Sequence, residues 1–273
     1  MDQKPIVSVI ISCYSRQEMI DKTLPAWLKQ EDIRYEVILG VGPDIVVPGG
    51  EDQPNLRVIR WTKEDVCDNS GVFSLIRGQN NLLKQARGRF VLTTYSDMLI
   101  NSDTQIRDMV NLWSANKNMV KRVVSARHYG GGYRHSGIFC HCLLVERDEL
   151  NAIGGWYNGY VGTYAHEDSE LMATLIERGN RIVFYSQSPE EGVHHIDHAH
   201  PHPDTYKDKF EASKAIYASR HKYTITQLVM MSWVMGGNNG GWSIGEDGEK
   251  QNLNNAQLAA AQAEMARKLF KGV

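Results

Sequence analysis

The chain has 273 residues, a length that a single α/β domain can account for. Hydrophobic residues make up 42% of it, enough for a substantial core, and the net charge of −2 excludes a strong general attraction to nucleic acid or acidic membranes. The four cysteines include no CxxC pair, so neither a disulfide framework nor a structural zinc site is predicted. No leader peptide is recognisable and no apolar run reaches the about 18 residues of a transmembrane helix, so we expect a cytoplasmic protein.

Short β-branched strands alternate with helical segments in the first third of the chain. Strands are predicted at Ile6–Ser12, Tyr35–Val41, Leu56–Trp61 and Phe90–Thr94. Helices are predicted at Arg16–Gln30, where we expect Pro25 to interrupt the helix with a kink or a short first turn, and at Ser70–Ala86. This alternation is typical of a doubly wound parallel sheet, in which ligands bind beyond the carboxyl ends of the strands. We therefore expect one ligand-binding edge to contain the segments Ser12–Arg16, Gly42–Asp44 and Tyr95–Met98.

The rest of the chain is less regular. Helices are predicted at Thr104–Asn116, Arg147–Ile153 and Glu167–Arg178, and strands at Val120–Ala126, Phe139–Glu146 and Arg181–Tyr185. After His202 the pattern is mostly helical to about Met231, followed by a loop rich in Gly and Asn at 236–248 and an Ala-rich helix at Asn254–Phe270. We assign residues 1–203 to an α/β domain and 204–273 to a helical extension packed on it.

One acidic residue directly follows a predicted strand. The segment GRFVLTTYSDM ends its strand on Ser96 and Asp97, so the carboxylate of Asp97 points into the ligand crevice. A carboxylate there can bind a hard divalent cation, which would in turn bridge a diphosphate. The alternative is an aspartate that only caps a turn.

A second segment combines an aromatic loop with adjacent acids. Residues 154–178 read GGWYNGYVGTYAHEDSELMATLIER, in which a loop rich in Gly and Tyr leads to His-Glu-Asp at a helix start. Aromatic rings offer flat faces on which a sugar can stack, and a neighbouring carboxylate can deprotonate an acceptor hydroxyl. Capping of the helix by either acid is the alternative.

A third segment is rich in histidine. Residues 192–202, GVHHIDHAHPH, hold five of the ten histidines of the chain. Neutral imidazole is a common ligand of transition metals, so we expect at least one of these residues to bind a metal. A histidine-rich surface tract without a role is the alternative.

Taken together, these segments resemble the GT-A glycosyltransferases, in particular glycosyltransferase family 2 and its galactosyltransferase-like relatives. VSVIISCYSR is similar to the family's opening VSVIIPTYNR, and RGQNNLLKQARGRFVLTTYSD to its ARNxGLxxAxGxYxxxLDxD. GGWYNGYVGTYAHEDSELMATLIERGNRI resembles GGFDExxxGxGEDxDLxxRxxxxGxxI, and VHHIDHAH resembles the closing HxxH. Four matches in the right order, over about residues 5–200, imply a mostly parallel central sheet flanked by helices.

The resemblance implies a role for each matching residue. Asp97 and His195, with His198 as second choice, fall on the metal ligands, which imply Mn²⁺ or, less favoured, Mg²⁺. Asp168 falls on the general base and Glu167 on its neighbour at the acceptor. The residues on the donor-binding positions are Ser12, Tyr14, Arg16, Asp44, Arg77, Asn80, Asn81, Ser96 and Asp97. The candidates for contact with the sugar or the acceptor are Trp156, Tyr157, Tyr160, Tyr164 and His166; for Trp156, packing beneath the loop is an equal alternative.

The implied reaction is transfer of a sugar from a nucleoside-diphosphate sugar, with a UDP-sugar expected, to an acceptor hydroxyl with inversion at the anomeric carbon. Two departures from the family pattern bear on the donor: Tyr95 replaces the first DxD acid, and VILGVGPD lacks the base-reading acid pair, with Asp44 as a substitute. A retaining transferase and a non-catalytic sugar-nucleotide-binding domain remain alternatives. A nucleotidyltransferase is disfavoured because SCYSRQEM lacks a Gly-rich phosphate loop.

The acceptor is left open between a glycan, a small metabolite, a lipid-linked sugar, a protein and a modified nucleic-acid base. A basic cluster could meet an anionic acceptor, although scattered surface charge is the simpler explanation; it comprises Lys117, Lys121, Arg122, Arg127 and Arg134. The loop at 236–248, with Trp233 and Trp242 beside it, is either an acceptor lid or a plain linker.

Overall fold

We describe the protein from a computed structural model of the whole chain. The residues that the structure describes are 4–68, 71, 73–117, 121–126, 128–130, 133–137, 141–163, 166–185, 192–198, 203–221, 242–244 and 250–252.

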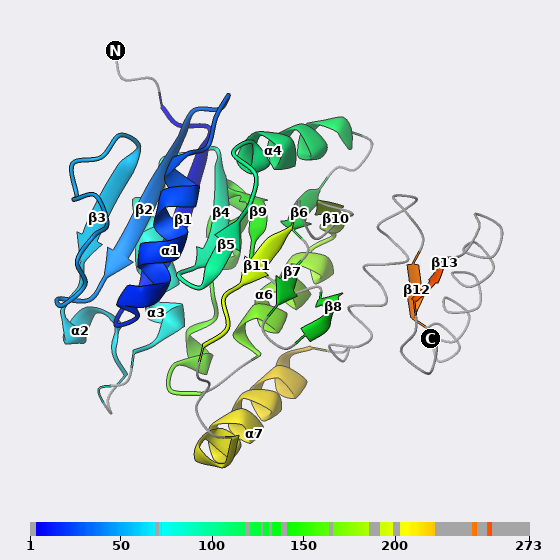
Figure 1. Cartoon of the computed structure of the whole chain (residues 1–273). Helices are drawn as coiled ribbons and strands as arrows, with labels where there is room; N and C mark the ends of the chain where they lie inside the picture. Colours follow the sequence, from blue (N-terminus) through cyan, green and yellow to red (C-terminus); the bar gives the residue numbers. More distant parts are fainter. Residues whose placement is uncertain are drawn as a thin grey trace.

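Seven strands form one mixed, mostly parallel sheet in the order β10-β6-β9-β4-β1-β2-β3 (Figure 1). They are β1 (Val7–Cys13), β2 (Tyr35–Val41), β3 (Leu56–Arg60), β4 (Phe90–Tyr95), β6 (Arg122–Ala126), β9 (Leu143–Glu146) and β10 (Arg181–Tyr185). Only β9 runs antiparallel to its neighbours, β4 and β6. The central strands are rich in Val and Ile and buried along their whole length, as expected for parallel strands covered on both faces. The predicted fold class is therefore confirmed.

Helices cover both faces of this sheet because successive side chains of each strand point to opposite sides. On β1, Val9 and Ile11 pack toward α1 (Gln17–Leu28) and α4 (Gln105–Ala115). Ile10, between them, packs toward α3 (Leu75–Gln85), α5 (Arg147–Ile153) and α6 (Glu167–Glu177). The core therefore consists of two layers, one on each side of the sheet.

Two of the predicted helices differ from the structure in detail. Helix α1 continues through Pro25 to Leu28. The helix predicted from Ser70 begins only at Leu75, and a short helix, α2 (Lys63–Val66), precedes it. The reason is that Phe73 forms a β-bridge with Cys67, and the Ser74 hydroxyl accepts a hydrogen bond of 3.4 Å from a backbone amide of the first helical turn.

A second sheet, which the sequence pattern did not predict, lies beside the ligand edge. Its order is β5-β11-β7-β8, formed by β5 (Met98–Ile100), β11 (Val193–His195), β7 (His128–Gly130) and β8 (Tyr133–Gly137). Strand β11 pairs antiparallel with β5, in a register that places His195 opposite Met98. The histidine-rich segment therefore lies next to the turn that follows β4 (Figure 1).

The C-terminal part contains α7 (Pro203–Arg220), which agrees with the predicted helical region. This helix is held on α6 by Glu170, a buried residue that accepts hydrogen bonds from Arg220 at 2.9 Å and Tyr160 at 3.0 Å and pairs with His221 at 2.6 Å. A short turn of 3₁₀ helix, η1 (Asn158–Tyr160), supplies the tyrosine.

The predicted loop at 236–248 is wrong in one stretch. Strand β12 (Trp242–Ile244) pairs antiparallel with β13 (Lys250–Asn252); Trp and Ile are residue types enriched in strands, which the Gly and Asn content of the segment obscured. Trp233 and the helix predicted at Asn254–Phe270 lie outside the described residues, and the division at residue 203 stays a prediction. In the described part of the chain, no helix combines the length and the apolar character that crossing a membrane needs.

A buried carboxylate connects the amino ends of the central strands. Glu36 on β2 accepts hydrogen bonds from Ser8 on β1 at 2.7 Å, from Arg57 on β3 at 2.9 Å and from Arg87 before β4 at 2.7 Å. Burial alone raises the pKa of Glu36, but the donors Arg87, Ser8 and Arg57 outweigh it and hold the pKa below its usual value. Glu36 therefore stabilises the sheet as an anion.

We expect Glu36→Gln to lower the free energy of unfolding at neutral pH by roughly 1.5–3 kcal/mol, the range for hydrogen bonds to a charged group. Because the folded pKa is depressed, this contribution is present above the unfolded pKa of about 4.3 and is lost as the pH falls through the folded value. The difference between wild type and variant should therefore shrink in acid, as urea unfolding at several pH values measures. The control is Glu51→Gln, which breaks a surface pair with Arg60 and should cost under about 1 kcal/mol. Equal losses in both variants would contradict the role of Glu36.

Candidate functional site

The carboxyl ends of β1, β2 and β4 meet at one edge of the sheet, as predicted. In the register of these strands, Ser12 lies opposite Gly40 on one side and Tyr95 on the other. The loops that follow the three strands therefore share this edge, which is where parallel α/β sheets bind ligands. The turn that carries Asp97, the start of α6 and the histidine-rich segment all lie at this edge.

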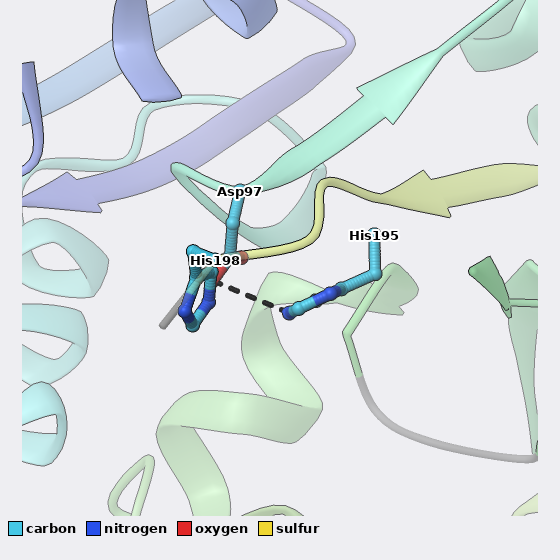
Figure 2. Close-up of side chains that lie close together, drawn as sticks. All are labelled: Asp97, His195 and His198. Atoms are coloured by element: carbon cyan, nitrogen blue, oxygen red, sulfur yellow. Dashed lines mark hydrogen bonds and ion pairs between the residues drawn. The ribbon is translucent and has the colours of Figure 1, made fainter. Parts of the chain in front are cut away.

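Asp97, His195 and His198 form a compact cluster at this edge (Figure 2). Asp97 lies in the turn between β4 and β5, His195 ends β11, and His198 follows it. The Asp97 Oδ2 atom is 3.1 Å from His198 Nε2 and 3.6 Å from His195 Nε2. The backbone amide of Ile196 donates a 2.9 Å hydrogen bond to the Asp97 carbonyl, which fixes the histidine segment against the turn.

The carboxylate of Asp97 is buried but ionised. Burial alone raises the pKa of Asp97, but the hydrogen bond and charge of His195, together with Arg16 and His198, lower that pKa to about 2. Its second oxygen, Oδ1, is buried without a hydrogen-bond partner among the described residues. A buried anion with an unsatisfied oxygen has strong affinity for a cation.

These three residues fit a divalent ion. Their ligand atoms lie within 4.8 Å of one another, and two ligands at right angles around an ion with bonds of about 2.1 Å are about 3 Å apart. One carboxylate and two imidazoles form a donor set suited to a first-row transition metal, because imidazole is a poorer ligand for Mg²⁺. The unsatisfied Oδ1 of Asp97 offers a further donor atom.

Arg16 at the start of α1 contacts the same atoms. Its Nη1 atom donates a hydrogen bond of 3.2 Å to Asp97 Oδ2 and lies 2.7 Å from His198 Nε2. A guanidinium can only donate, so the contact with Arg16 needs the lone pair of His198 Nε2, whereas the 3.1 Å hydrogen bond of the same nitrogen to Asp97 Oδ2 needs its proton. The two contacts therefore belong to different tautomers of His198. A metal bond at His198 Nε2 would use the same lone pair as the Arg16 contact, so an ion bound there would displace Arg16.

Asp168 and Glu167 begin α6 on the other side of the edge. Asp168 Oδ1 accepts a short hydrogen bond from the Tyr95 hydroxyl, and Asp168 Oδ2 lies 3.0 Å from His141 Nε2. Burial and, next, the neighbouring charge of Asp168 raise the pKa of Glu167 to about 7. Burial alone lowers the pKa of His141, but its hydrogen bond with Asp168 raises the pKa above the usual value.

Sequence reasoning missed both partners of Asp168. The family resemblance marks Tyr95 only as the replacement of a lost acid, and it gives no role to His141. A signal for Tyr95 was present, since a tyrosine that ends a buried strand at the ligand edge brings its hydroxyl to that edge. His141 offered none, because its neighbour in space is distant in sequence.

Aromatic rings and close backbone contacts shape the side of the edge next to β2. Tyr14 stacks on Phe73 with ring centroids 5.2 Å apart, and Trp61 lies 6.0 Å from Phe73. Two glycines allow this packing: a Cβ on Gly40 would lie 2.1 Å from the Trp61 ring, and one on Gly42 would lie 2.0 Å from the Tyr14 carbonyl oxygen. This packing holds Tyr14 at the part of the edge where we predict that the donor binds.

Asp44 lines an open pocket just beyond β2. The other residues around it are Pro43, Ile45, Val46, Val47, Gly50, Glu51, Arg60, Trp61 and Thr62. The wall of the pocket is largely apolar, and Asp44 is one of its few charged groups. That Asp44 takes the place of the base-reading acid stays a prediction. The pocket offers space beside Asp44 for such a contact.

The other predicted donor contacts have protein partners of their own. Ser12 Oγ accepts a 3.4 Å hydrogen bond from Gln79, and the Ser96 carbonyl accepts one of 2.8 Å from Thr23. Arg77 donates to the Cys67 carbonyl. Asn81 Oδ1 accepts a hydrogen bond from Trp61 at 3.4 Å. Their predicted contacts with ribose and diphosphate stay predictions.

Asn80 is engaged with the aromatic loop. Its Nδ2 donates to the Trp156 carbonyl at 2.8 Å and to Asn158 Oδ1 at 3.1 Å, and its Oδ1 accepts from the Trp156 backbone amide at 2.9 Å. Gly155 completes this contact, because its φ of +75° and the 2.3 Å approach of Asn80 Oδ1 to a Cβ position both favour glycine. Asn80 therefore connects α3 with the loop that precedes α6.

The predicted sugar and acceptor residues have different surroundings. Trp156 is 2% exposed and packs in the core, which favours the packing alternative for this residue. Tyr157 is 42% exposed, with the Arg220 guanidinium 3.6 Å from its ring centroid. His166 faces α7, where its Nδ1 lies 2.8 Å from Ser213 Oγ. Tyr164 lies outside the described residues.

The proposed basic cluster is divided among structural contacts. Lys121 pairs with Glu149 at 3.2 Å, and Arg122 is buried with its guanidinium 3.7 Å from the Trp113 ring centroid. Lys117 is exposed, and the side chains of Arg127 and Arg134 lie outside the described part. The described members thus favour scattered charge over an acceptor patch.

No protein-family model and no curated protein matches the sequence. The structure, in contrast, matches solved glycosyltransferase structures over most of its length. TarS of S. aureus in complex with UDP-GlcNAc matches with a TM-score of 0.55 and 16% identity, over 83% of this chain and 70% of that one. A longer TarS structure has a TM-score of 0.55 and 16% identity over 84% of this chain, which spans only 43% of it.

The mannosyltransferase PcManGT from Pyrobaculum calidifontis, solved with GDP-Man and Mn²⁺, matches over the whole chain. Its TM-score is 0.51 with 13% identity, and the match covers 100% of this chain and 89% of that one. These likenesses establish that the chain has the GT-A fold, which confirms the fold that the sequence resemblance implied.

We expect Asn80→Ala to lower the free energy of unfolding by roughly 1–3 kcal/mol, because it leaves the partly buried Trp156 backbone groups without their partner. Urea unfolding measures this loss. Asn111→Ala, at an exposed position of α4, is the matched control and should leave stability nearly unaffected. Normal stability of Asn80→Ala would contradict the connecting role of Asn80.

Proposed function

We propose that this protein is a metal-dependent glycosyltransferase that moves a sugar from a nucleoside-diphosphate sugar to an acceptor hydroxyl. The observation that carries the proposal is the Asp97–His195–His198 cluster, located at the ligand edge of a GT-A fold. Asp168 on α6 also supports the proposal. Its carboxylate lies at the same edge, where it accepts a hydrogen bond from the hydroxyl of Tyr95, and Tyr95 is two residues before Asp97.

Aromatic side chains and solved structures of the same fold support a nucleotide sugar as the donor. Tyr14 and the apolar pocket beside Asp44 offer surfaces for a base and ribose. Similar structures have been solved with UDP-GlcNAc and with GDP-Man and Mn²⁺. We propose a UDP-sugar as the donor and Mn²⁺ as the preferred ion, with Mg²⁺ as the alternative.

Asp97, His195 and His198 would hold the ion. When bound, the ion supplies positive charge that stabilises the negative charge developing on the leaving diphosphate. Arg16, whose guanidinium lies 3.2 Å from Asp97 Oδ2, would add a positive charge beside an anionic donor. The ion and Arg16 would together offset the charge of a diphosphate.

Asp168 acts as the general base in this proposal. The acceptor hydroxyl gives its proton to the Asp168 carboxylate and attacks the anomeric carbon from the face opposite the diphosphate, so the configuration inverts. Glu167, whose pKa is raised to about 7 by burial and by Asp168, lies beside it and can bind the acceptor as either donor or acceptor of a hydrogen bond.

We expect Asp97→Asn to weaken Mn²⁺ binding by at least roughly 100-fold, because it removes the negative charge of a ligand, and His198→Ala by roughly 10–100-fold, because it removes a ligand atom. Titration of Mn²⁺ followed by electron paramagnetic resonance measures this directly and requires no substrate. His194→Ala should retain affinity, since His194 is not part of the cluster. Equal affinity in all three variants, or activity that survives exhaustive chelation, would sink the metal proposal.

We expect Asp168→Asn to reduce turnover by roughly 10²–10⁴-fold while leaving donor and Mn²⁺ binding intact. Release of nucleoside diphosphate from UDP- and GDP-sugars with Mn²⁺ present is the assay, and Asp148→Asn, at an exposed carboxylate of α5, is the control. Near-normal turnover in Asp168→Asn removes this residue from the role. Donor binding without any release in the wild type would favour a non-catalytic binding domain.

A further inference from the structure

Two side chains hold the carboxylate of Asp168, one at each oxygen. The Tyr95 hydroxyl donates to Oδ1, and His141 Nε2 lies 3.0 Å from Oδ2. The two rings also contact each other edge to face, with centroids 5.4 Å apart and an interplanar angle of 70°. Tyr95 is 8% exposed, so its ring has little room to move. The three residues form one packed unit.

Tyr95 connects the two halves of the site. It is the last residue of β4 and precedes the turn that carries Asp97, while its hydroxyl reaches the first turn of α6. In glycosyltransferase family 2, which the sequence resembles, this position carries an acid. The tyrosine therefore differs from the family's residue in charge as well as in size. The hydroxyl makes its contact with Asp168, on α6.

We propose that Tyr95 and His141 are positioning residues that fix the orientation of the Asp168 carboxylate toward the acceptor hydroxyl. This inference rests on the proposed role of Asp168 as the general base. In this proposal Tyr95 takes the position of the missing acid, but its role is to orient the base and not to bind the donor.

A carboxylate oxygen has two lone pairs, so an oxygen that accepts one hydrogen bond can still take up a proton. In the step, the proton moves to Asp168 and the acceptor oxygen bonds to the anomeric carbon. The bond from that carbon to the diphosphate oxygen breaks, and its electron pair leaves with the diphosphate. A carboxylate that rotates freely would present these lone pairs in the right direction only part of the time.

The raised pKa of His141 is consistent with this arrangement, because its hydrogen bond with Asp168 favours an imidazole that donates. Tyr95 contributes through geometry alone. We therefore expect loss of either donor to impair the chemical step and to leave donor binding intact.

The test compares Tyr95→Phe with Tyr35→Phe, which also removes a buried tyrosine hydroxyl bond, the 2.8 Å contact of Tyr35 with the Leu28 carbonyl. The probe is release of nucleoside diphosphate from UDP-GlcNAc, or from GDP-mannose if that is the sugar nucleotide turned over, with Mn²⁺ present. We expect Tyr95→Phe to lower kcat by roughly 10–100-fold with KM for the donor unchanged, and Tyr35→Phe to leave both unchanged. An unchanged kcat, or a raised donor KM at normal kcat, overturns the inference.

His141 is tested by a conservative rescue. His141→Gln keeps a nitrogen donor in place of Nε2, and His141→Ala removes it. We expect the alanine variant to lose kcat as Tyr95→Phe does and the glutamine variant to recover most of it. Equal losses in both variants would show a merely structural role and overturn this half of the inference.

Asp168→Asn separates the inference from the proposed function. If Asp168 is the base and Tyr95 acts through it, Tyr95→Phe adds little to Asp168→Asn in the double variant. If Asp168→Asn is severe while Tyr95→Phe is silent, the base stands and the inference fails. If Tyr95→Phe is severe while Asp168→Asn is mild, both fail.

A crystal structure of Tyr95→Phe tests the inference without activity. We expect the Asp168 carboxylate to rotate from its orientation in the wild type, while the Asp97 cluster is preserved. An unrotated Asp168 would contradict a positioning role for Tyr95.

Discussion

The antiparallel pairing of β11 with β5 determines where the site forms. These two short strands place His195 opposite Met98, one residue beyond Asp97. A slip of one residue would turn the His195 ring to the other face of the sheet, because side chains alternate along a strand. The hydrogen bond from Ile196 to the Asp97 carbonyl prevents that slip. The cluster that supports a metal site is thus a consequence of strand register.

Buried carboxylates recur in this fold, and each is stabilised in a different way. Glu36 is surrounded by arginines and a serine at the amino ends of the strands, where its charge holds loops together. Glu170 fixes α7 onto α6 through Arg220 and His221. Asp97, in contrast, retains an oxygen without a hydrogen-bond partner among the described residues. That contrast separates a structural carboxylate from a candidate ligand, since buried polar groups in stable structures are normally satisfied.

The departures from the family pattern acquire physical meaning in the structure. Tyr95 stands where the resembled family has an acid, and its hydroxyl donates a hydrogen bond to Asp168. The negative charge is lost, but Tyr95 connects the turn that carries Asp97 with the proposed base. Arg16 contacts both Asp97 and His198, which gives the site a cation of its own that an incoming ion must displace. Structures of this fold have been solved with UDP-GlcNAc and with GDP-Man. In this protein the open pocket beside Asp44 is where we propose that the base binds.

The alternation of strands and helices, the ligand edge and the position of Asp97 could be predicted from the sequence, because they follow from the local hydrophobic pattern and from parallel-strand topology. Strand Tyr35–Val41, helix Arg147–Ile153 and strand Arg181–Tyr185 have the same bounds as predicted. The family resemblance placed His195 first and His198 second beside Asp97, and only the folded chain shows that both meet it. The same holds for the contacts of His141 and Tyr95 with Asp168 and for the support that Asn80 gives to the loop at Trp156. These contacts join residues far apart in the chain through strand register and side-chain direction, and no local pattern in the sequence encodes either.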